Sequence, residues 1–458
     1  MNRILIAGTG SGCGKTTITL GILKALTDRG VKVQPYKTGP DFIDPQFHTY
    51  VTGRTSRNLD SWMLTAPMLQ YLLARHGADV DLSLIEGVMG FYDGRLADPL
   101  SGSTAELSSH TRTPVILTVN CRGMALSIAA LINGYKDFLN DRPIQGVILN
   151  NIRPQTYEIL KPQLELYTGV KVVGYLPPLP NLVLPERQLG LMAPAELPDL
   201  DEQLNQLGAQ VNETIDLEYL IQVSAQAPIL SASRPEELSA ALEWANSGDR
   251  KSLRLGLARD QAFSFYYQDN LDLLSEMNVD WVPFSPLSDR FLPAGLDGVY
   301  FGGGYPERFA ASLADNQTMR SSIQAALNKG LPTVAEGGGF LYLGETLRDE
   351  EGDTYKMCGV LPVNAHMTNS LRRFGYVTLQ ARSDGPLLAK GGVVKAHEFH
   401  YSETDNNGDG FTIQKSASSG WTGGHVTAVF QAAYPHVHWY ANPVAAARFT
   451  QVCRGKQF

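Results

Sequence analysis

The stretch "GTGSGCGKTT", residues 8–17, follows an apolar run and precedes a helical pattern. Glycines in such a turn let consecutive backbone N–H groups point toward phosphate oxygens, and the helix N-terminus adds partial positive charge. The spacing from Gly8 to Gly14 is one residue longer than the strict G-x-x-x-x-G-K-[ST] pattern, because Thr9 stands where that pattern has glycine. The strand–loop–helix context still predicts a nucleotide-binding P-loop rather than a structural glycine-rich turn.

The expected ligand of this loop is ATP with Mg²⁺. Lys15 would pair with the β- and γ-phosphates, and Thr16 would ligate the metal ion. Asn151, in the "NN" pair at a strand end, could read the base or simply form a turn. The predicted nucleotide-binding residues are Gly8, Gly12, Gly14, Lys15, Thr16, Thr17 and Asn151.

Two later segments place acidic residues where the next strands should end. The segment "YKTGPDFIDPQFH" (36–48) and the segment "IEGVMGFYDG" (85–94) together contain Lys37, Asp41, Asp44, His48, Glu86 and Asp93. Ligands in open parallel sheets bind beyond the carboxyl ends of the strands, so both loops should face the P-loop. Carboxylates there can hold Mg²⁺, although any one of them could instead cap a helix or form a turn.

A second candidate site is "TVAEGGGFLYLGETL" (333–347), where an apolar run ends at Glu336 and a helix pattern begins at Phe340. A strand, a tight turn and a helix present a reactive side chain at the rim of an α/β sheet. Here the turn contains only Gly337, Gly338 and Gly339. The pattern therefore predicts a nucleophile elbow that lacks its nucleophile.

Two series of apolar runs must position these loops. The first lies at 3–8, 31–37, 81–87, 114–120, 145–151 and 170–176, and the second at 253–259, 279–284, 296–304, 331–336 and 425–431. Continuous apolar runs separated by helix-length segments are typical of parallel strands covered on both faces. We predict an α/β protein with a P-loop domain at 1–225, a linker at 226–250 and a second α/β domain at 251–458.

The composition restricts the function classes. A chain of 458 residues has room for two or three domains, and 43% hydrophobic and 18% charged residues are ordinary for a globular protein. The net charge of −8 argues against nucleic acid or an anionic membrane as the main partner, and no run approaches the length of a membrane span. The four cysteines have neither metal-ligand spacing nor a disulfide framework. We expect a cytoplasmic enzyme.

The long motifs resemble, in order, those of the cobyrinate a,c-diamide synthase family. They are "GTGSGCGKTT", "YKTGPDFIDP", "EGVMGFYDG", "GVILNN", "DNLDLL", "FSPL", "FGGGYPE", "AEGGGFLYL" and "HEFHYS". The resemblance implies a dethiobiotin-synthetase-like P-loop domain followed by a class I glutamine amidotransferase-like domain. It also implies ATP-dependent amidation of the a and c carboxylates of cobyrinate through acyl phosphates, with glutamine as the usual ammonia source. The nickel-sirohydrochlorin a,c-diamide synthases share this layout, and the sequence does not separate the two substrates.

The resemblance also suggests roles for individual residues. Asp41 and Glu86 resemble metal or phosphate-site residues, and Asp44 and Asp93 resemble residues that position the substrate or an intermediate. The candidate substrate-binding residues are Lys37, Asp44, Asp93 and Arg187, with Arg95 and Arg153 as further cations that could equally be solvated. Where the family usually has histidine in "LPERQLGL" (184–191), this chain has Gln188.

In this family the elbow carries a cysteine whose thiolate attacks glutamine, and Gly337 occupies its position. His436 and His438 in "YPHVHW" lie where the family has its general base, and the amides of Gly303 and Gly304 would form the oxyanion hole. A glycine cannot form the thioester that this mechanism requires. None of the four cysteines lies in the turn, and the nearest, Cys358, opens the strand-like segment "CGVLPV".

Three explanations of Gly337 remain open from the sequence. The protein uses free ammonia, it receives ammonia from a separate glutaminase, or its cysteine has been replaced deliberately. The leading hypothesis is an ATP-dependent amidoligase with an impaired glutaminase domain, and a second is a non-catalytic, nucleotide-switched binding protein. The expected partners are a tetrapyrrole polycarboxylate, glutamine or ammonia, and a second copy of the chain as a possible homodimer.

Overall fold

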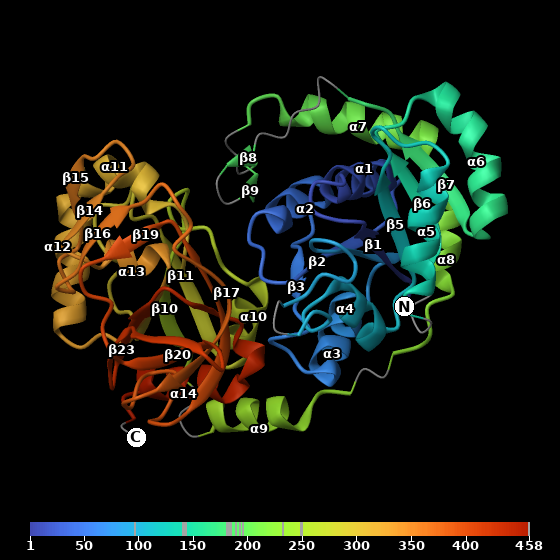
Figure 1. Ribbon diagram of the computed structural model, residues 1–458. Helices are drawn as coiled ribbons and strands as arrows, with labels where there is room; N and C mark the ends of the chain where they lie inside the picture. The colour runs from blue at the N-terminus through green and yellow to red at the C-terminus, as the bar shows by residue number, and fades with distance from the viewer. Residues whose placement is uncertain are drawn as a thin grey trace. The chain divides into compact units, whose positions relative to one another are not determined.

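The computed structural model describes residues 1–95, 98–139, 144–179, 186–187, 190–191, 194, 197–230, 233–247 and 251–456. They form two compact units, Met1–Arg234 and Pro235–Phe458 (Figure 1). The division lies inside the segment 226–250 that we predicted to be a linker. Within that segment, α9 (Glu236–Ala245) packs against α14 (Pro443–Cys453) of the second unit.

The first unit contains a seven-stranded sheet with strand order β3-β2-β4-β1-β5-β6-β7, and every pairing is parallel. The strands are β1 (Arg3–Gly8), β2 (Val33–Thr38), β3 (Arg57–Leu59), β4 (Leu82–Glu86), β5 (Val115–Asn120), β6 (Ile144–Asn150) and β7 (Lys171–Leu176). β1, β2 and β4 are buried along their whole length, which explains their continuous apolar character. Six of these strands match the predicted runs, whereas β3 is too short to leave a pattern.

Helices cover both faces of this sheet (Figure 1). They are α1 (Lys15–Asp28), α2 (Asp44–Thr52), α3 (Ala66–His76), α4 (Thr104–Thr111), α5 (Ser127–Asp137), α6 (Pro154–Thr168), α7 (Leu200–Thr214) and α8 (Leu217–Ala225). α1 packs against α7 and α2, while α3 packs against α4 and α5 against α6. A short pair, β8 (Glu186–Arg187) and β9 (Gly190–Leu191), precedes α7.

The second unit has a six-stranded sheet of order β11-β10-β12-β13-β23-β22. Its strands are β10 (Leu253–Ala258), β11 (Val279–Phe284), β12 (Gly298–Phe301), β13 (Thr333–Glu336), β22 (His425–Thr427) and β23 (Phe430–Ala433). The prediction of one strand at 425–431 was wrong, because β22 and β23 form an antiparallel hairpin. The turn residues Ala428 and Val429 include no glycine, asparagine or proline that would have marked it.

A five-stranded antiparallel sheet of order β21-β20-β17-β18-β24 adds to this unit. It consists of β17 (Arg373–Ala381), β18 (Val393–His400), β20 (Phe411–Ser416), β21 (Ser419–Gly423) and β24 (His436–Val437). A four-stranded sheet contains β14 (Thr346–Arg348), β15 (Thr354–Lys356), β16 (Asn364–Met367) and β19 (Ser402–Thr404). The remaining helices are α10 (Gln268–Glu276), α11 (Ala310–Asp315), α12 (Gln317–Asn328), α13 (Gly338–Tyr342) and the 3₁₀ segments η2 (Pro306–Phe309) and η3 (Trp439–Ala441). The predicted α/β class is therefore confirmed.

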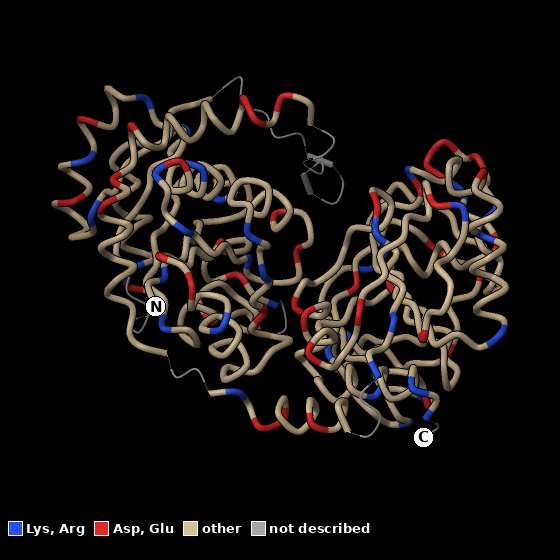
Figure 2. The backbone as a smooth tube through the Cα atoms, turned by 180° about the vertical axis from the view of Figure 1, so that it is seen from behind, with Lys and Arg blue, Asp and Glu red and all other residues tan. Residues whose placement is uncertain are grey.

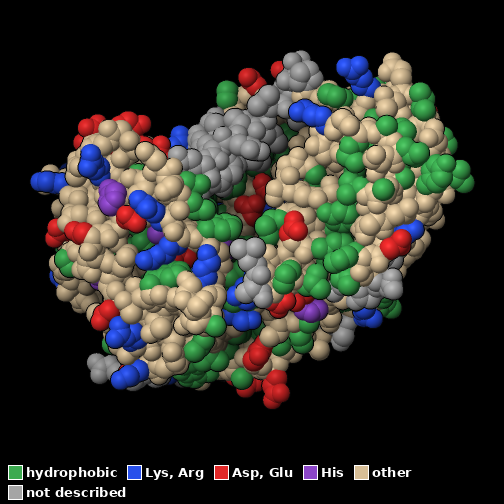
Figure 3. Space-filling view, in the orientation of Figure 1, with side chains coloured by type: hydrophobic (Ala, Val, Ile, Leu, Met, Phe, Trp, Pro, Cys, Tyr) green, Lys and Arg blue, Asp and Glu red, His purple; other side chains and the backbone are tan. Residues whose placement is uncertain are grey.

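Acidic and basic residues are interspersed along the backbone of both units (Figure 2). The face shown in Figure 3 likewise carries charged and apolar side chains next to one another. Among the described residues, none of the helices combines the length and apolar character that crossing a bilayer requires.

Candidate functional site

The predicted P-loop connects the end of β1 at Gly8 to the start of α1 at Lys15. Gly12 and Gly14 have φ angles of +70° and +96°, which side-chain-bearing residues rarely adopt. A Cβ atom on Gly14 would lie 1.9 Å from Nδ2 of Asn150. The backbone conformation therefore favours glycine at both positions, and at Gly14 the close approach of Asn150 also requires it.

Thr9 departs from the strict motif without disturbing the loop. Its φ angle is not among the positive values of the described non-glycine residues, so a side chain is tolerated there. Its N–H donates to the carbonyl of Thr118 at 3.1 Å, and its carbonyl accepts from the Tyr135 hydroxyl at 2.7 Å. The first peptide of the loop is thus held by β5 on one side and α5 on the other.

Lys15 is buried and its ammonium group folds over the loop. Nζ donates to the carbonyl of Gly10 at 2.9 Å and lies 3.9 Å from Sγ of Cys13. Burial lowers the pKa of Lys15, and the Lys37 cation lowers it further. An anion over the loop would therefore stabilise the charged form of Lys15.

The acidic loops meet the start of α1, as their positions in the sequence suggested. Thr16 Oγ1 donates to Glu86 Oε1 at 2.7 Å and lies 3.4 Å from Asp44 Oδ2. Lys37 Nζ is 2.8 Å from Glu86 Oε1 and 3.8 Å from Asp41 Oδ2, and it also donates to Asp44. One ammonium group therefore lies among three carboxylates beside the P-loop threonine.

The protonation of this cluster follows from burial and charge. Burial and the neighbouring Asp41 carboxylate raise the pKa of Asp44 well above its usual value. Burial would also raise the pKa of Glu86, but Lys37 and His48 outweigh it and hold that pKa far below the usual range. Burial disfavours the Lys37 cation, yet the three carboxylates overcome it and raise the pKa of Lys37. Glu86 and Lys37 are thus an ion pair at neutral pH.

His48 has a contact that the sequence did not reveal. Its Nε2 lies 2.6 Å from Glu86 Oε2, and its Nδ1 lies 3.2 Å from the Ser56 hydroxyl. The sequence placed His48 in the acidic loop without assigning it a role. The available signal was its position four residues after Asp44, because residues with that spacing share one face of a helix.

Asp41 and Asp93 both stabilise turns at the same edge of the sheet. Asp41 Oδ1 accepts a hydrogen bond from the N–H of Ile43 at 2.8 Å, and its other oxygen, Oδ2, lies on the side of Lys37. Asp93 Oδ2 accepts the N–H of Gly90 at 2.9 Å, and Gly90 forms a β-bridge with Thr9 of the P-loop. The turn that carries Asp93 is therefore attached to the phosphate loop.

Of the two neighbouring asparagines, Asn150 contacts the P-loop directly. Its Nδ2 donates to the carbonyl of Cys13 at 2.9 Å. Asn151, the predicted base-reading residue, has a φ angle of +59°, and its Nδ2 donates to Oδ1 of Asn120 at 3.1 Å. Asn151 thus lies where β5 and β6 end.

The predicted arginines have other surroundings or are only partly described. The Arg95 guanidinium lies over the Trp62 ring, 4.7 Å from its centroid, and Arg153 is exposed at the start of α6. For Arg187 the structure describes only the backbone, in β8, and Gln188 lies outside the described residues.

The residues of this cluster fit a nucleotide with Mg²⁺. A buried cation, Lys37, already lies among hard oxygen ligands, which shows that this position favours positive charge. The Thr16 hydroxyl and the carboxylates of Glu86 and Asp41 are the donor types that Mg²⁺ prefers. They lie next to a glycine-rich loop at the N-terminus of α1, a position where backbone N–H groups can bind phosphates.

The second predicted site has the backbone of a nucleophile elbow. Gly337, between β13 and α13, has φ +50° and ψ −113°. A Cβ atom at this position would lie 2.6 Å from Nε2 and 2.9 Å from Cε1 of His436. The imidazole therefore occupies the space beside the missing side chain.

His436 and His438 have different surroundings. His436 Nδ1 lies 3.6 Å from Oε2 of the buried Glu336, and Glu336 accepts hydrogen bonds from the Tyr300 hydroxyl and the Val437 N–H. His438 Nε2 lies 3.9 Å from Oδ2 of Asp269, and burial lowers the pKa of His438 to about 4. Of the two predicted bases, His436 is therefore the one that contacts the elbow.

The predicted oxyanion loop lies against the same elbow. A Cβ atom on Gly303 would lie 2.4 Å from Cε1 of His436, and one on Gly338 would lie 3.2 Å from the nitrogen of Gly304. The Gly303 carbonyl accepts the N–H of Phe265 at 3.0 Å, which fixes this loop. The His436 ring is thus held between two glycine positions.

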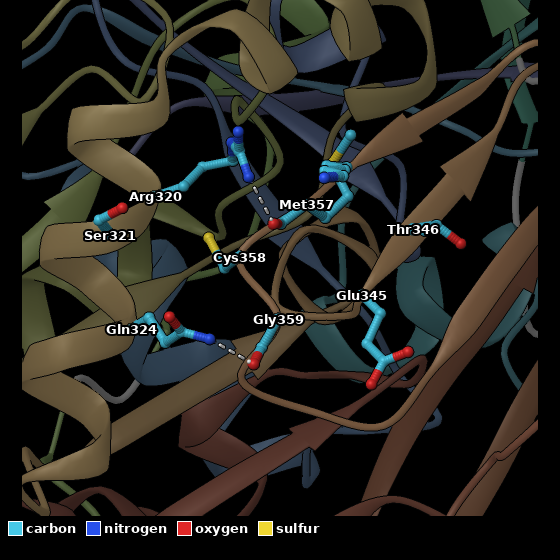
Figure 4. Close-up of a pocket in the computed structure, with 9 residues that line it drawn as sticks. Arg320, Ser321, Gln324, Glu345, Thr346, Met357, Cys358 and Gly359 are labelled. Atoms are coloured by element: carbon cyan, nitrogen blue, oxygen red, sulfur yellow. Dashed lines mark hydrogen bonds between the residues drawn. The ribbon is translucent and has the colours of Figure 1, made fainter.

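Cys358 lies in an environment different from that of the elbow at Gly337. It lines a pocket of about 310 Å³ near α12, where Arg320 donates to the Met357 carbonyl and Gln324 to the Gly359 carbonyl (Figure 4). Burial raises the pKa of Cys358 to about 12. Its thiol therefore stays protonated at neutral pH and is a poor nucleophile.

Both units match known families. Residues 4–191 match the model described as the CobQ/CobB/MinD/ParA nucleotide binding domain, and residues 254–444 match the CobB/CobQ-like glutamine amidotransferase domain. Among solved structures, PurLQS from Thermotoga maritima aligns at 12% identity over 44% of this chain and 98% of that chain, with a TM-score of 0.32.

Curated relatives align over nearly the whole chain. The cobyrinate a,c-diamide synthase of Streptococcus sanguinis is 41% identical and covers 96% of both chains. The proteins of the same name from Listeria innocua and Salmonella typhimurium are 41% and 40% identical, covering 97% and 98% of both chains. The chain therefore belongs to the cobyrinate a,c-diamide synthase family of amidoligases, with a nucleotide-binding domain followed by a glutamine amidotransferase domain.

Proposed function

We propose that this protein uses ATP to convert the a and c carboxylates of cobyrinate to amides through acyl phosphates. In this chain the nitrogen source is ammonia, because the step that would release it from glutamine is impaired. The observation that supports the ligase most directly is the contact of Thr16 with Glu86 beside Lys37, three residues from three elements that meet at the P-loop.

The chemistry required of this site is the activation of a weak electrophile. A carboxylate has a poor leaving group, and transfer of the γ-phosphoryl group converts it to an acyl phosphate that ammonia can attack. Lys15 would stabilise negative charge on the transferred phosphoryl group, while the backbone of Gly12 and Gly14 holds the other phosphates. Mg²⁺, when bound by Thr16, Glu86 and Asp41, would neutralise charge between the phosphates.

Other side chains of the cluster would act on the substrate. Asp44 lies beside Thr16, and Asp93 lies on the turn that is attached to Thr9. From these positions they could orient the substrate carboxylate or the incoming ammonia. Lys37 would exchange one of its carboxylate partners for the negatively charged substrate or phosphate. Asn151 would contact the base at the ends of β5 and β6.

The impairment of the glutaminase step rests on Gly337. The base and the oxyanion loop cannot replace the nucleophile of a covalent mechanism, and loss of such a nucleophile can reduce the rate by about a millionfold. The acid activation in the first unit does not depend on that nucleophile. The ligase reaction with ammonia should therefore be intact.

The test is to incubate the purified protein with ATP, Mg²⁺ and cobyrinate, with either ammonium chloride or glutamine. We expect mass spectrometry to show a diamide with ammonium and no product with glutamine. Equal product from glutamine would contradict our interpretation of Gly337.

Parallel reactions with nickel sirohydrochlorin test the substrate. If the protein amidates nickel sirohydrochlorin faster than cobyrinate, nickel sirohydrochlorin becomes the proposed substrate. Absence of amide with both compounds and both nitrogen sources, together with nucleotide-dependent binding of a protein, would indicate the nucleotide-switched binding protein instead.

The cellular setting is a further part of the proposal. We expect a cytoplasmic enzyme, because disulfides are rare in that compartment and the four cysteines are free in the structure. Light scattering of the purified chain would test the expected homodimer.

A further inference from the structure

Met89 has an unusual backbone conformation next to the proposed nucleotide site. Four non-glycine residues in the described part of the chain have positive φ angles, namely Met89, Arg112, Asn151 and Asn278. Arg112 ends helix α4, where the left-handed conformation is common, and asparagine tolerates this conformation. Met89, with φ +47°, has neither explanation.

The residues on both sides impose this conformation. The N–H of Val88 donates to Oγ1 of Thr104 at 2.9 Å, and that hydroxyl donates back to the Val88 carbonyl at 3.0 Å. On the other side, the N–H of Gly90 donates to Asp93, and Gly90 bridges to Thr9. The peptides that flank Met89 are thus fixed to α4 and to the phosphate loop.

Glycine would satisfy this backbone at lower cost, so a role for the methionine side chain is needed to explain the residue. A bulky residue held in such a region costs on the order of 1–3 kcal/mol, and such strain is concentrated at functional sites. The Met89 side chain is 37% exposed, although it is apolar. It follows the carboxyl end of β4, between Glu86 and Asp93, where ligands of parallel sheets bind.

We propose that the Met89 side chain packs against the face of the tetrapyrrole ring and determines affinity for that substrate. This inference rests on the proposed function. A tetrapyrrole polycarboxylate combines a large apolar ring with acidic groups at its edge. A flexible, polarisable thioether suits the ring face, while the acidic edge reaches the cations and phosphates beside Thr16.

The test compares three substitutions at this position. Met89→Asn keeps a residue that tolerates the backbone but removes the apolar side chain, Met89→Gly removes both side chain and strain, and Met89→Leu restores an apolar side chain. Leu166→Asn changes an equally apolar residue that is 78% exposed on α6 and serves as the control. The ammonium-dependent reaction gives kcat and the KM values for cobyrinate and for ATP. The absorbance change of cobyrinate gives its Kd without ATP.

We expect Met89→Asn and Met89→Gly to raise both constants for cobyrinate about tenfold, as loss of one buried apolar side chain predicts. The KM for ATP and kcat should change less than twofold, and Met89→Leu and Leu166→Asn should resemble the wild type. Unchanged KM and Kd in Met89→Asn would overturn the inference, as would equal losses in Met89→Leu.

These outcomes separate the two proposals. Wild-type protein that binds cobyrinate but does not amidate it would overturn the proposed function, and the Kd ratio would still decide the role of Met89. Wild-type protein that neither binds nor amidates a tetrapyrrole would overturn both.

Discussion

At Gly337 the backbone has the conformation of a nucleophile elbow, but glycine provides no reactive side chain. The sequence predicted this turn, because a short apolar strand, three glycines and a helix pattern follow one another. It could not decide between His436 and His438, since His436 lies in the two-residue strand β24 and His438 directly follows it, and the pairing of this strand orients both. The register that places His436 opposite His397 is a property of the folded sheet. The same limit applies to Asn150 and Asn151, whose separate contacts depend on where β6 ends.

The first prediction is that Gly337→Cys creates glutaminase activity. The new thiol would lie beside His436 and the loop of Gly303, so ammonia release from glutamine should become measurable. The substitution should also lower the free energy of unfolding by about 1–3 kcal/mol, because cysteine is strained at φ +50° and its Cβ would press on the imidazole. A coupled ammonia assay and chemical denaturation measure the two effects.

Gly337→Ala is the matched control, because it introduces the same strain without a thiol. It should lose similar stability and release no ammonia. A folded Gly337→Cys protein without glutaminase activity would show that the arrangement of His436 and the oxyanion loop is not competent.

At the scale of elements, the proposed nucleotide site lies where β1, β2 and β4 end. The sequence predicted that Asp41, Asp44 and Glu86 would gather there, because parallel strands place their carboxyl ends at one edge. It did not reveal that Lys37 would pair with all three. Lys37 lies in strand β2, which is buried along its whole length. Its carboxylate partners come from other segments, so they are next to it only once the sheet is assembled. The contact of His48 with Glu86 likewise depends on how α2 packs.

The second prediction concerns Lys37→Met. Removal of this cation leaves the buried Asp44 and Glu86 without their lysine counter-ion, with only the contacts of Thr16 and His48 remaining. This loss should cost about 3–5 kcal/mol of stability in the first unit. Millimolar Mg²⁺ should restore part of this loss, because the carboxylates would then bind the metal ion instead. Thermal unfolding with and without Mg²⁺ measures both quantities.

Lys24→Met provides the comparison, because Lys24 pairs with the half-exposed Asp28 on α1. Its effect should stay below about 1 kcal/mol and should not respond to Mg²⁺. Equal losses in the two variants would mean that Lys37 is not the counter-ion of the cluster.

At the scale of the whole molecule, the chain consists of two compact units, Met1–Arg234 and Pro235–Phe458. The end of the first unit depends on contacts that leave no local pattern. Arg3, fully buried at the start of β1, donates to the carbonyl of Pro228 at 2.6 Å, and Arg112 donates to that of Ile229 at 2.8 Å. Residues so distant in sequence cannot be paired from composition or periodicity.

The third prediction is that Arg3→Met destabilises only the first unit. The guanidinium also donates to the carbonyls of Met1, Thr111 and Arg112, so several buried acceptors would lose their donor at about 1–3 kcal/mol each. Differential scanning calorimetry should show one transition shifted by several degrees and the other unchanged. Arg254→Met, which removes an exposed arginine from the second unit, should change the free energy of unfolding of neither unit by more than about 1 kcal/mol.

A shift of both transitions in Arg3→Met would show that the two units unfold cooperatively. That result would contradict the division of the chain at Arg234 as an energetic boundary.

The position of the His436 ring between Gly303 and Gly337 also bears on chemical complementation. Enzymes that lose a side chain often retain a vacancy into which a small molecule can diffuse and act in its place. Here the His436 imidazole already occupies the space beside Gly337. We therefore expect that methanethiol or a similar additive does not bind there. A cysteine at position 337 differs from such an additive, because the main chain would hold its Cβ against the His436 ring and force the ring to move.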